Sequence, residues 1–275
     1  MTHESVWKKI ITHACLLIGV AISVFPFYWL VVMSTNETSA VLAFPPKLTF
    51  GGYFMTNIQH VLEKIDFFRA LLNTLFVAAV STTLHLFFES LTGFTFAKFT
   101  FPGSKALFYL MLATLMIPGQ MLLVPQFIMI QQLGWLGSYK ALIIPGMAGA
   151  FGIFWIRQYA AAIHDELLDA GRIDGCNNFR LYWHVGLPVL RPALALLAIT
   201  TFMGNWEDYM WPLIVLTDTS KFTLMLALAQ LKSVHTQDYA MVMTGTLMAT
   251  VPLIVFFFLA SRHIIAGIAE GAVKS

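Results

Sequence analysis

Apolar stretches of membrane length alternate with short polar segments along this chain. The first, residues 10–36, runs for 27 residues without Asp, Glu, Lys or Arg and follows Lys8 and Lys9. A spanning helix needs about 20 apolar residues, so this stretch can cross a bilayer with some tilt. The apolar part of a cleaved signal peptide has only about 7–15 residues. We therefore expect a retained first transmembrane helix with the two lysines on the inner side.

Five further stretches follow the same pattern. We expect them to span the membrane at residues 70–97, 106 to about 131, 140–162, 192–216 and 239–261. The third stretch contains Pro118 and Pro125. Proline frees backbone carbonyls, which lipid tolerates only where neighbouring groups or a cavity satisfy them. The predicted fold class is an all-α membrane protein with six transmembrane helices.

The polar segments between these stretches complete the predicted organisation. Residues 37–69 contain the turn-rich stretch FPPKLTFGGY and then NIQHVLEKIDFF, which we expect to form a short amphipathic helix on the outer surface. The fifth span is interrupted at NWEDYMWP and resumes to about Leu216. We divide the chain into residues 1–69 (first span and external segment), 70–262 (a core with five spans) and 263–275 (a cytoplasmic tail).

Composition and charge agree with a membrane protein. The chain is 58% hydrophobic and 11% charged, against about 25% charged in soluble domains. Its net charge of +2 and the absence of a basic patch do not suggest nucleic acid binding. Cys15 and Cys176 are read as two unpaired thiols. With both termini inside, ten of the sixteen Lys and Arg residues fall in cytoplasmic segments, as the positive-inside rule prefers.

Residues 164–192 form a polar island between two long apolar stretches. This island, HDELLDAGRIDGCNNFRLYWHVGLPVLRP, holds seven of the thirty Asp, Glu, Lys and Arg residues. The topology above places it in the cytoplasm. Such a loop can simply pack against its own helices, but connections are usually short, and this one is long and has internal order.

The island predicts two helices joined by a glycine turn. Asp165 to Ile173 has acidic residues in its first turns, which the helix dipole favours, and Asp169 can pair with Arg172 at i+3. An apolar stripe follows one side, made by Ile163, Leu167, Ala170 and Ile173. Gly175 can end this helix in a left-handed conformation. We expect Asn178 to cap a second helix, which Leu187-Pro188 ends.

These residues carry a family resemblance. The sequence DAGRIDG at 169–175, followed by Leu187-Pro188 and Pro192, resembles the EAA motif of the membrane subunits of bacterial ABC importers, in the form of the maltose-type carbohydrate permeases. NTLFVA at 73, FTFAKFTFPG at 94, MIPGQMLLVPQF at 116, LGWLGSYKALIIP at 133, FGIFWIRQ at 151 and NWEDYMWPLIVL at 205 extend the similarity over most of the chain. Two positions depart from the motif: Asp169 replaces the usual Glu, and Gly171 the second Ala.

The resemblance implies a type I importer permease fold, with a coupling helix at about 164–176 that docks in a groove of an ATP-binding subunit. Its docking residues would include Glu166, Asp169, Ala170, Gly171, Asp174 and Gly175, and Leu187 and Pro188 would join the helix to the fifth span. The implied partners are a second, non-identical permease, two ATP-binding subunits that carry ATP and Mg, an external solute-binding protein and membrane lipid. The implied cargo is a sugar or oligosaccharide, and the implied location is the bacterial inner membrane.

Polar groups at membrane depth suggest a substrate path. The candidates cluster at the break in the fifth span and in the third span: Gln120, Asn205, Trp206, Glu207, Asp208 and Tyr209. The two acids can equally pair with the partner permease or contact the external binding protein. Gln126, like Gln120, can either lie on the path or form interhelical hydrogen bonds. For Glu89 in the second span we expect a buried structural pair. Gly146, Gly149, Ala150 and Gly152 are small enough to let another helix approach closely.

Catalytic and metal motifs are missing from the sequence. It contains no GxxxxGK[ST] phosphate loop, and His164-Asp165-Glu166 lacks the second histidine of a zinc protease motif. We assign no catalytic residue, metal or resident cofactor to this chain. Two other classes remain as alternatives: an ion-gradient-driven secondary transporter, which usually shows internal repeats, and a membrane assembly subunit that transports nothing.

Overall fold

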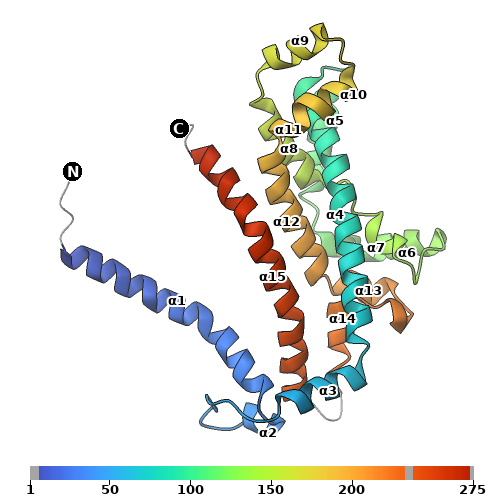
Figure 1. The fold of residues 1–275 in the computed structure, drawn as a ribbon. Coiled ribbons are helices and arrows are strands. Elements are labelled where there is room, and N and C mark those ends of the chain that lie inside the picture. The colour runs from blue at the N-terminus through green and yellow to red at the C-terminus, as the bar shows by residue number, and fades with distance from the viewer. Residues whose placement is uncertain (1–5, 233–237, 273–275) are drawn as a thin grey trace. The chain divides into compact units, whose positions relative to one another are not determined.

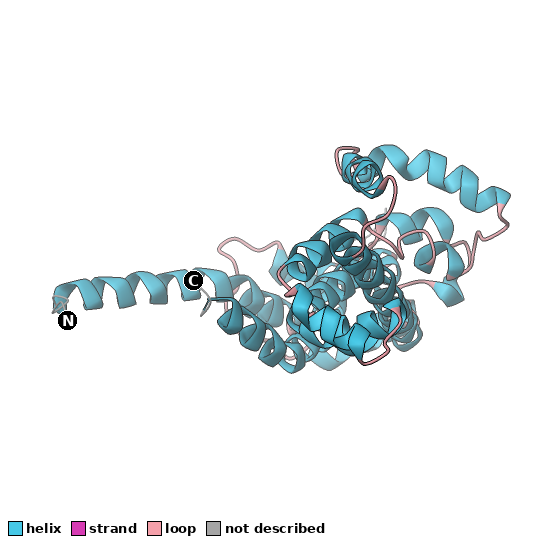
Figure 2. Ribbon diagram, turned by 90° about the horizontal axis from the view of Figure 1, so that it is seen from above, coloured by secondary structure: helices cyan, strands magenta, loops and turns pink. Residues whose placement is uncertain are grey.

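The computed structural model describes residues 6–232 and 238–272, and every regular element in these ranges is a helix (Figure 2). The chain divides into two compact units, Met1–Phe67 with Leu228–Leu253, and Phe68–Ala227 with Ile254–Ser275.

The first unit contains α1 (Val6–Ser34), α2 (Thr38–Val41), α3 (Phe54–Lys64) and the first part of α15 (Tyr239–Ala272). The buried Asn57 amide joins α3 to the end of α1 by donating to the carbonyls of Ser34 and Asn36, both at 2.9 Å. The predicted amphipathic helix is present. It begins earlier, at Phe54, and it ends at Lys64, because Ile65 has an extended conformation.

The second unit is built on α4 (Phe67–Lys98), α8 (Ala150–Ala161) and α12 (Arg191–Glu207). Figure 1 shows α4 and α12 side by side. Their shared core includes Phe94 from α4, Ile156 from α8 and Leu197 from α12, each less than 5% exposed. The predicted second span, 70–97, forms one continuous helix, α4.

The predicted third span is not one straight helix. It consists of α5 (Ser104–Thr114), the 3-10 helix η1 (Gly119–Leu122) and α6 (Leu123–Gln132), and the two halves are bent by 93°. The bend lies at Pro118, which has an extended ψ of 128°. Pro125 lies in the first turn of α6, where the missing N–H costs no helical hydrogen bond.

The predicted fourth span is also divided, into α7 (Lys140–Ile143) and α8, with non-helical residues 144–149 between them. The fifth breaks where expected: α12 ends at Glu207 and α13 (Met210–Val215) follows. Between α13 and α15 lie η3 (Thr219–Lys221) and α14 (Leu224–Ala229). In the predicted tail, residues 263–272 continue α15, and 273–275, with Lys274, lie outside the described residues.

Three of the described helices are long and apolar enough to cross a bilayer: Trp7–Ser34, Phe67–Lys98 and Tyr239–Phe258. The number rises to five if each of the two bent pairs, Ser104–Thr114 with Gly119–Gln132 and Asn178–Val189 with Arg191–Glu207, is one span. Six spans stay a prediction that is consistent with these helices.

Candidate functional site

The polar island folds as two short helices. The first, α9, spans Asp165–Ile173, the bounds that the sequence predicts. Asp165 and Glu166 lie in its first turn and Arg172 in its last, so the charges complement the helix dipole at both ends. Arg172 donates to Asp169 at 2.6 Å, which confirms the predicted i, i+3 pair.

Gly175 ends α9 with a φ of +80°. Its N–H donates to the carbonyl of Arg172, and the Cys176 N–H donates to that of Gly171, both at 3.0 Å. These two bonds form a Schellman motif, in which a left-handed residue satisfies the last carbonyls of a helix. The prediction that Gly175 ends the helix in a left-handed conformation is therefore confirmed.

The two faces of α9 differ in exposure. Leu168 and Gly171 are buried, and a Cβ built on Gly171 would lie 2.6 Å from Leu181 Cδ2. On the other side, Leu167 is 47% exposed and Ile173 87%. Of the predicted docking residues, those on the exposed surface are Glu166, Asp169, Ala170, Asp174 and Gly175. Gly171 instead faces inward.

The second helix of the island corrects two expectations. Asn177, not Asn178, provides the cap: its side chain accepts from the Arg180 N–H at 2.9 Å. The helix continues through α10 (Asn178–Arg180), the π-helical η2 (Leu181–Gly186) and α11 (Leu187–Val189), so Leu187-Pro188 does not end it. The wider π turn directly before Pro188 accommodates the missing N–H of that residue.

Three hydrogen bonds join α4 to the island and to Ile163, the residue directly before it. Lys98 Nζ donates to Asp165 Oδ1 at 2.8 Å and to the Ile163 carbonyl. The Tyr182 hydroxyl and Ser90 Oγ share a hydrogen bond of 2.7 Å. The hydrogen bond and charge of Lys98 lower the pKa of the Asp165 carboxyl below its ordinary value.

Close packing between the π-helical turn and α4 adds to these hydrogen bonds. A Cβ built on Gly186 would lie 2.6 Å from Phe94 Cε2, so the π turn approaches α4 as closely as a glycine permits. The Phe94 and Tyr182 ring centroids are 5.8 Å apart. These contacts hold the island on the end of α4.

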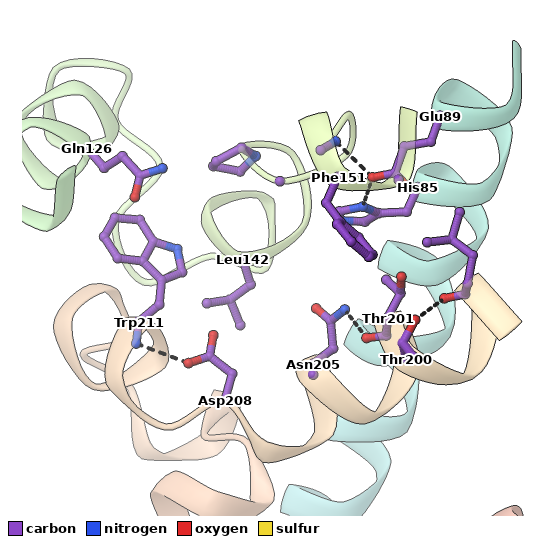
Figure 3. A pocket seen from close by; sticks show the side chains of 16 residues that line it. His85, Glu89, Gln126, Leu142, Phe151, Thr200, Thr201, Asn205, Asp208 and Trp211 are labelled. Atoms are coloured by element: carbon purple, nitrogen blue, oxygen red, sulfur yellow. Dashed lines mark hydrogen bonds and ion pairs between the residues drawn. The ribbon is translucent and has the colours of Figure 1, made fainter. Parts of the chain in front are cut away.

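A cavity of about 530 Å³ lies in the second unit, among α4, α6, the 144–149 segment and α12 (Figure 3). Its wall combines amide, hydroxyl and carboxyl groups with one indole. Its polar and aromatic members include His85, Glu89, Thr200, Asn205, Asp208 and Trp211.

Glu89 is the most buried acid of this wall, with 2% exposure. Its Oε1 accepts from the Gly149 N–H at 2.8 Å and lies 2.8 Å from His85 Nδ1. Its Oε2 is buried without a partner in the described residues. The predicted buried pair is confirmed, and its partner is His85, one turn earlier on α4.

The glycines of the 146–152 segment leave space for the His85 and Glu89 side chains. A Cβ built on Gly152 would lie 1.8 Å from Glu89 Oε2, and one on Gly146 would lie 3.3 Å from His85 Nε2. The expected close approach is therefore made by α4.

Of the six clustered substrate-path candidates, two line the cavity and four do not, and Gln126 of the third span lines it as well. Asn205 Nδ2 donates to the Thr201 carbonyl at 2.8 Å, and Asp208 Oδ1 accepts from the Trp211 N–H at 3.3 Å. The four outside the lining are Gln120, Trp206, Glu207 and Tyr209. Trp206 is buried and stacks on Phe202, because it occupies the core side of α12.

Sequence reasoning missed several residues of both sites. Lys98, Tyr182 and Gly186 anchor the island, and His85 and Trp211 line the cavity. His85 had a local signal, since it precedes Glu89 by four residues in a helix. The others come together only through tertiary packing.

Comparison with known proteins identifies the family. Residues 89–267 match the family described as "Binding-protein-dependent transport system inner membrane component". The lactose transport system permease protein LacG of Rhizobium radiobacter is 34% identical, with 96% of each chain covered. The arabinooligosaccharides permease AraQ of Bacillus subtilis is 30% identical, covering 91% of this chain and 90% of the relative. The sn-glycerol-3-phosphate permease UgpE of Escherichia coli K12 is 31% identical, covering 98% and 99%.

A solved structure shows the same fold. A chain from the crystal structure of a bacterial ABC transporter involved in the import of the acidic polysaccharide alginate superposes with a TM-score of 0.82, at 22% identity, covering 95% of this chain and 99% of that one. The fold is thus that of an ABC importer permease. This chain belongs to the family of binding-protein-dependent transport system inner membrane components and is a multi-pass permease subunit of an ABC importer.

Proposed function

We propose that this permease forms a path for a sugar or oligosaccharide and that α9 couples this path to separate ATP-binding subunits. The names of the lactose and arabinooligosaccharide permeases support the cargo class. The observation that carries the coupling role is the exposed apolar face of α9, where Ile173 is 87% exposed. An exposed apolar side chain on a rigidly held helix is typical of a protein interface.

Docking uses the outer surface of α9. Ala170 is small enough for close approach, and Asp169 and Asp174 supply charge at the rim. Gly171 lies on the inner face of α9 and does not contact the partner directly. Its missing side chain lets α9 pack closely on Leu181. Leu187 and Pro188 continue the island toward α12, so that a shift of α9 reaches the fifth span.

The working transporter contains a second, non-identical permease, two ATP-binding subunits and an external solute-binding protein. ATP and Mg bind to the ATP-binding subunits, and this chain catalyses no reaction of its own. Both of its termini lie in the cytoplasm, as the distribution of Lys and Arg favours.

The test is ATP-driven sugar uptake by the assembled transporter in proteoliposomes. We expect Ile173→Asp to lower uptake and retention of the ATP-binding subunits by about tenfold or more, since a charge at an interface anchor costs about 2 kcal/mol or more. Asn178→Ala, an exposed change in the same loop, serves as the matched control and keeps both.

Two results contradict the proposal. One is an Ile173→Asp transporter that retains its ATP-binding subunits and full uptake. The other is uptake that persists without these subunits and collapses with the proton gradient, which favours an ion-driven carrier.

A further inference from the structure

The cavity wall carries two acids and neither Lys nor Arg. Among the sixteen described residues that line it, Glu89 and Asp208 are carboxylic acids, and none is Lys or Arg (Figure 3). The one basic side chain in the lining is His85, and its Nδ1 already contacts Glu89 at 2.8 Å. An incoming phosphate or uronate would therefore meet the Asp208 carboxylate, which has no basic partner in the lining, and like charges repel more strongly near a protein wall than in bulk water.

The same wall offers what a neutral sugar needs. Sugar hydroxyls are donors, and carboxylate oxygens are strong acceptors. In the lining, Asp208 supplies a carboxylate, and Thr200, Thr201 and Asn205 supply hydroxyl and amide groups, whereas Glu89 Oε2 is buried against Gly152. The Trp211 indole is held by its Nε1 donating to the Ala141 carbonyl at 2.8 Å, and a fixed aromatic face packs against the apolar side of a sugar ring.

We propose that this cavity is a cargo-contact site of the permease that admits neutral sugars and excludes phosphorylated or acidic ones. The inference rests on the proposed sugar uptake and narrows it. It also separates this chain from two similar proteins whose names mention glycerol phosphate and the acidic polysaccharide alginate.

Charge selection is testable without knowledge of the cargo. In the assembled transporter in nanodiscs, with Cys15→Ser and Cys176→Ser, the Thr200→Cys variant places a thiol in the cavity wall. We expect a cationic methanethiosulfonate to modify it about tenfold faster than an anionic one, after correction for their rates with a free thiol, because acidic clefts concentrate cations. Adding Asp208→Asn lowers this preference.

Ser104→Cys provides the control for charge. Ser104 lines a separate hollow of about 190 Å³ together with Lys105 and Arg157, so the anionic reagent should react faster there. Thr201→Cys replaces Thr200→Cys if the latter fails to assemble. Equal rates at the cavity thiol, or no reaction with either reagent while the Ser104→Cys thiol reacts, overturn the inference.

Uptake assays separate this inference from the proposed function. We expect ATP-driven uptake of a neutral oligosaccharide and none of sn-glycerol 3-phosphate or a uronate oligosaccharide. Uptake of an anionic sugar overturns the neutral-cargo inference and leaves sugar import intact. Absence of any ATP-driven sugar uptake contradicts the proposed function, while the thiol rates still report the charge of the cavity.

Discussion

Gly149 and Gly152 let the Glu89 carboxylate lie against the first turn of α8. The Gly149 N–H donates to Oε1 at 2.8 Å, and Oε2 occupies the space of a Cβ on Gly152. A helix N-terminus has unsatisfied N–H groups and a positive dipole end, so it stabilises a buried acid. Two missing methyl groups thus determine where an ionisable side chain can sit inside the membrane protein.

Gly152→Ala should therefore destabilise the permease. The new methyl group would overlap Glu89 Oε2, and overpacking of this kind costs about 1–3 kcal/mol. Thermal unfolding of the purified complex measures the loss. Gly204→Ala, where no atom lies within 4 Å of the added Cβ, should be neutral or stabilising by up to about 1 kcal/mol. If Glu89→Ala does not reduce the cost of Gly152→Ala in a double-mutant cycle, the carboxylate is not the cause.

A second prediction at the residue scale concerns pH. The pKa of Asp165 is lowered by Lys98, so this pair stabilises the folded state above the unfolded value of 3.8 and loses that effect as the pH falls through the lower folded value. The difference in Tm between wild type and Asp165→Asn should thus be constant between about pH 8 and pH 5 and narrow only at lower pH. A difference that changes near neutral pH would point to another group.

At the scale of elements, α9 combines a fixed inner face with a free outer face. Leu168 and Gly171 pack inward, and the Schellman motif at Gly175 ends the helix. Lys98 holds the start of the helix through the Ile163 carbonyl and Asp165. A helix of nine residues is marginal alone in water, so these contacts at both ends give it the rigidity that transmission of force requires.

Changes at Gly175 test this element. Gly175→Val forces a β-branched residue into a φ of +80°, which costs roughly 1–3 kcal/mol. It should reduce sugar uptake per ATP hydrolysed. Gly175→Asn, which tolerates the left-handed region, should retain most of the coupling. Equal loss in the two variants would mean that the outer surface of Gly175, rather than its backbone conformation, is what matters.

At the scale of the whole molecule, the chain's membrane topology stays a prediction. Three described helices can span the membrane, or five with the bent pairs, and six spans would place both termini on one side. The native Cys176 lies in the island, partly exposed, and so reports which side the island faces.

A membrane-impermeant maleimide should label Cys176 in inverted vesicles and not in intact cells, in a Cys15→Ser background. Thr217→Cys in a Cys176→Ser background, an exposed site between the predicted fifth and sixth spans, should show the opposite pattern. Labelling of both sites from the same side would overturn the six-span arrangement.

Local signals in the sequence predicted the elements better than the cavity. Charge placement and Gly175 define α9, and Glu89 was expected to be buried and paired. The cap at Asn177, the π turn and the bend at Pro118 depend on the tertiary setting, which no local pattern contains. The cavity was missed in part for the same reason: Asn205 and Asp208 stood out as polar groups at membrane depth, whereas Trp211 lines it because α13 packs against α6 and α7.

One unbroken helix, α4, serves both the cavity and the island. Glu89 lines the cavity, while the next residue, Ser90, bonds to Tyr182, and Phe94 and Lys98 hold the island further along. A substitution in α4 that changed the cargo preference would therefore also disturb the coupling of α9 to the ATP-binding subunits. Adaptation to a different sugar has a freer route through Trp211, which faces the cavity from α13, an element outside both α4 and the island.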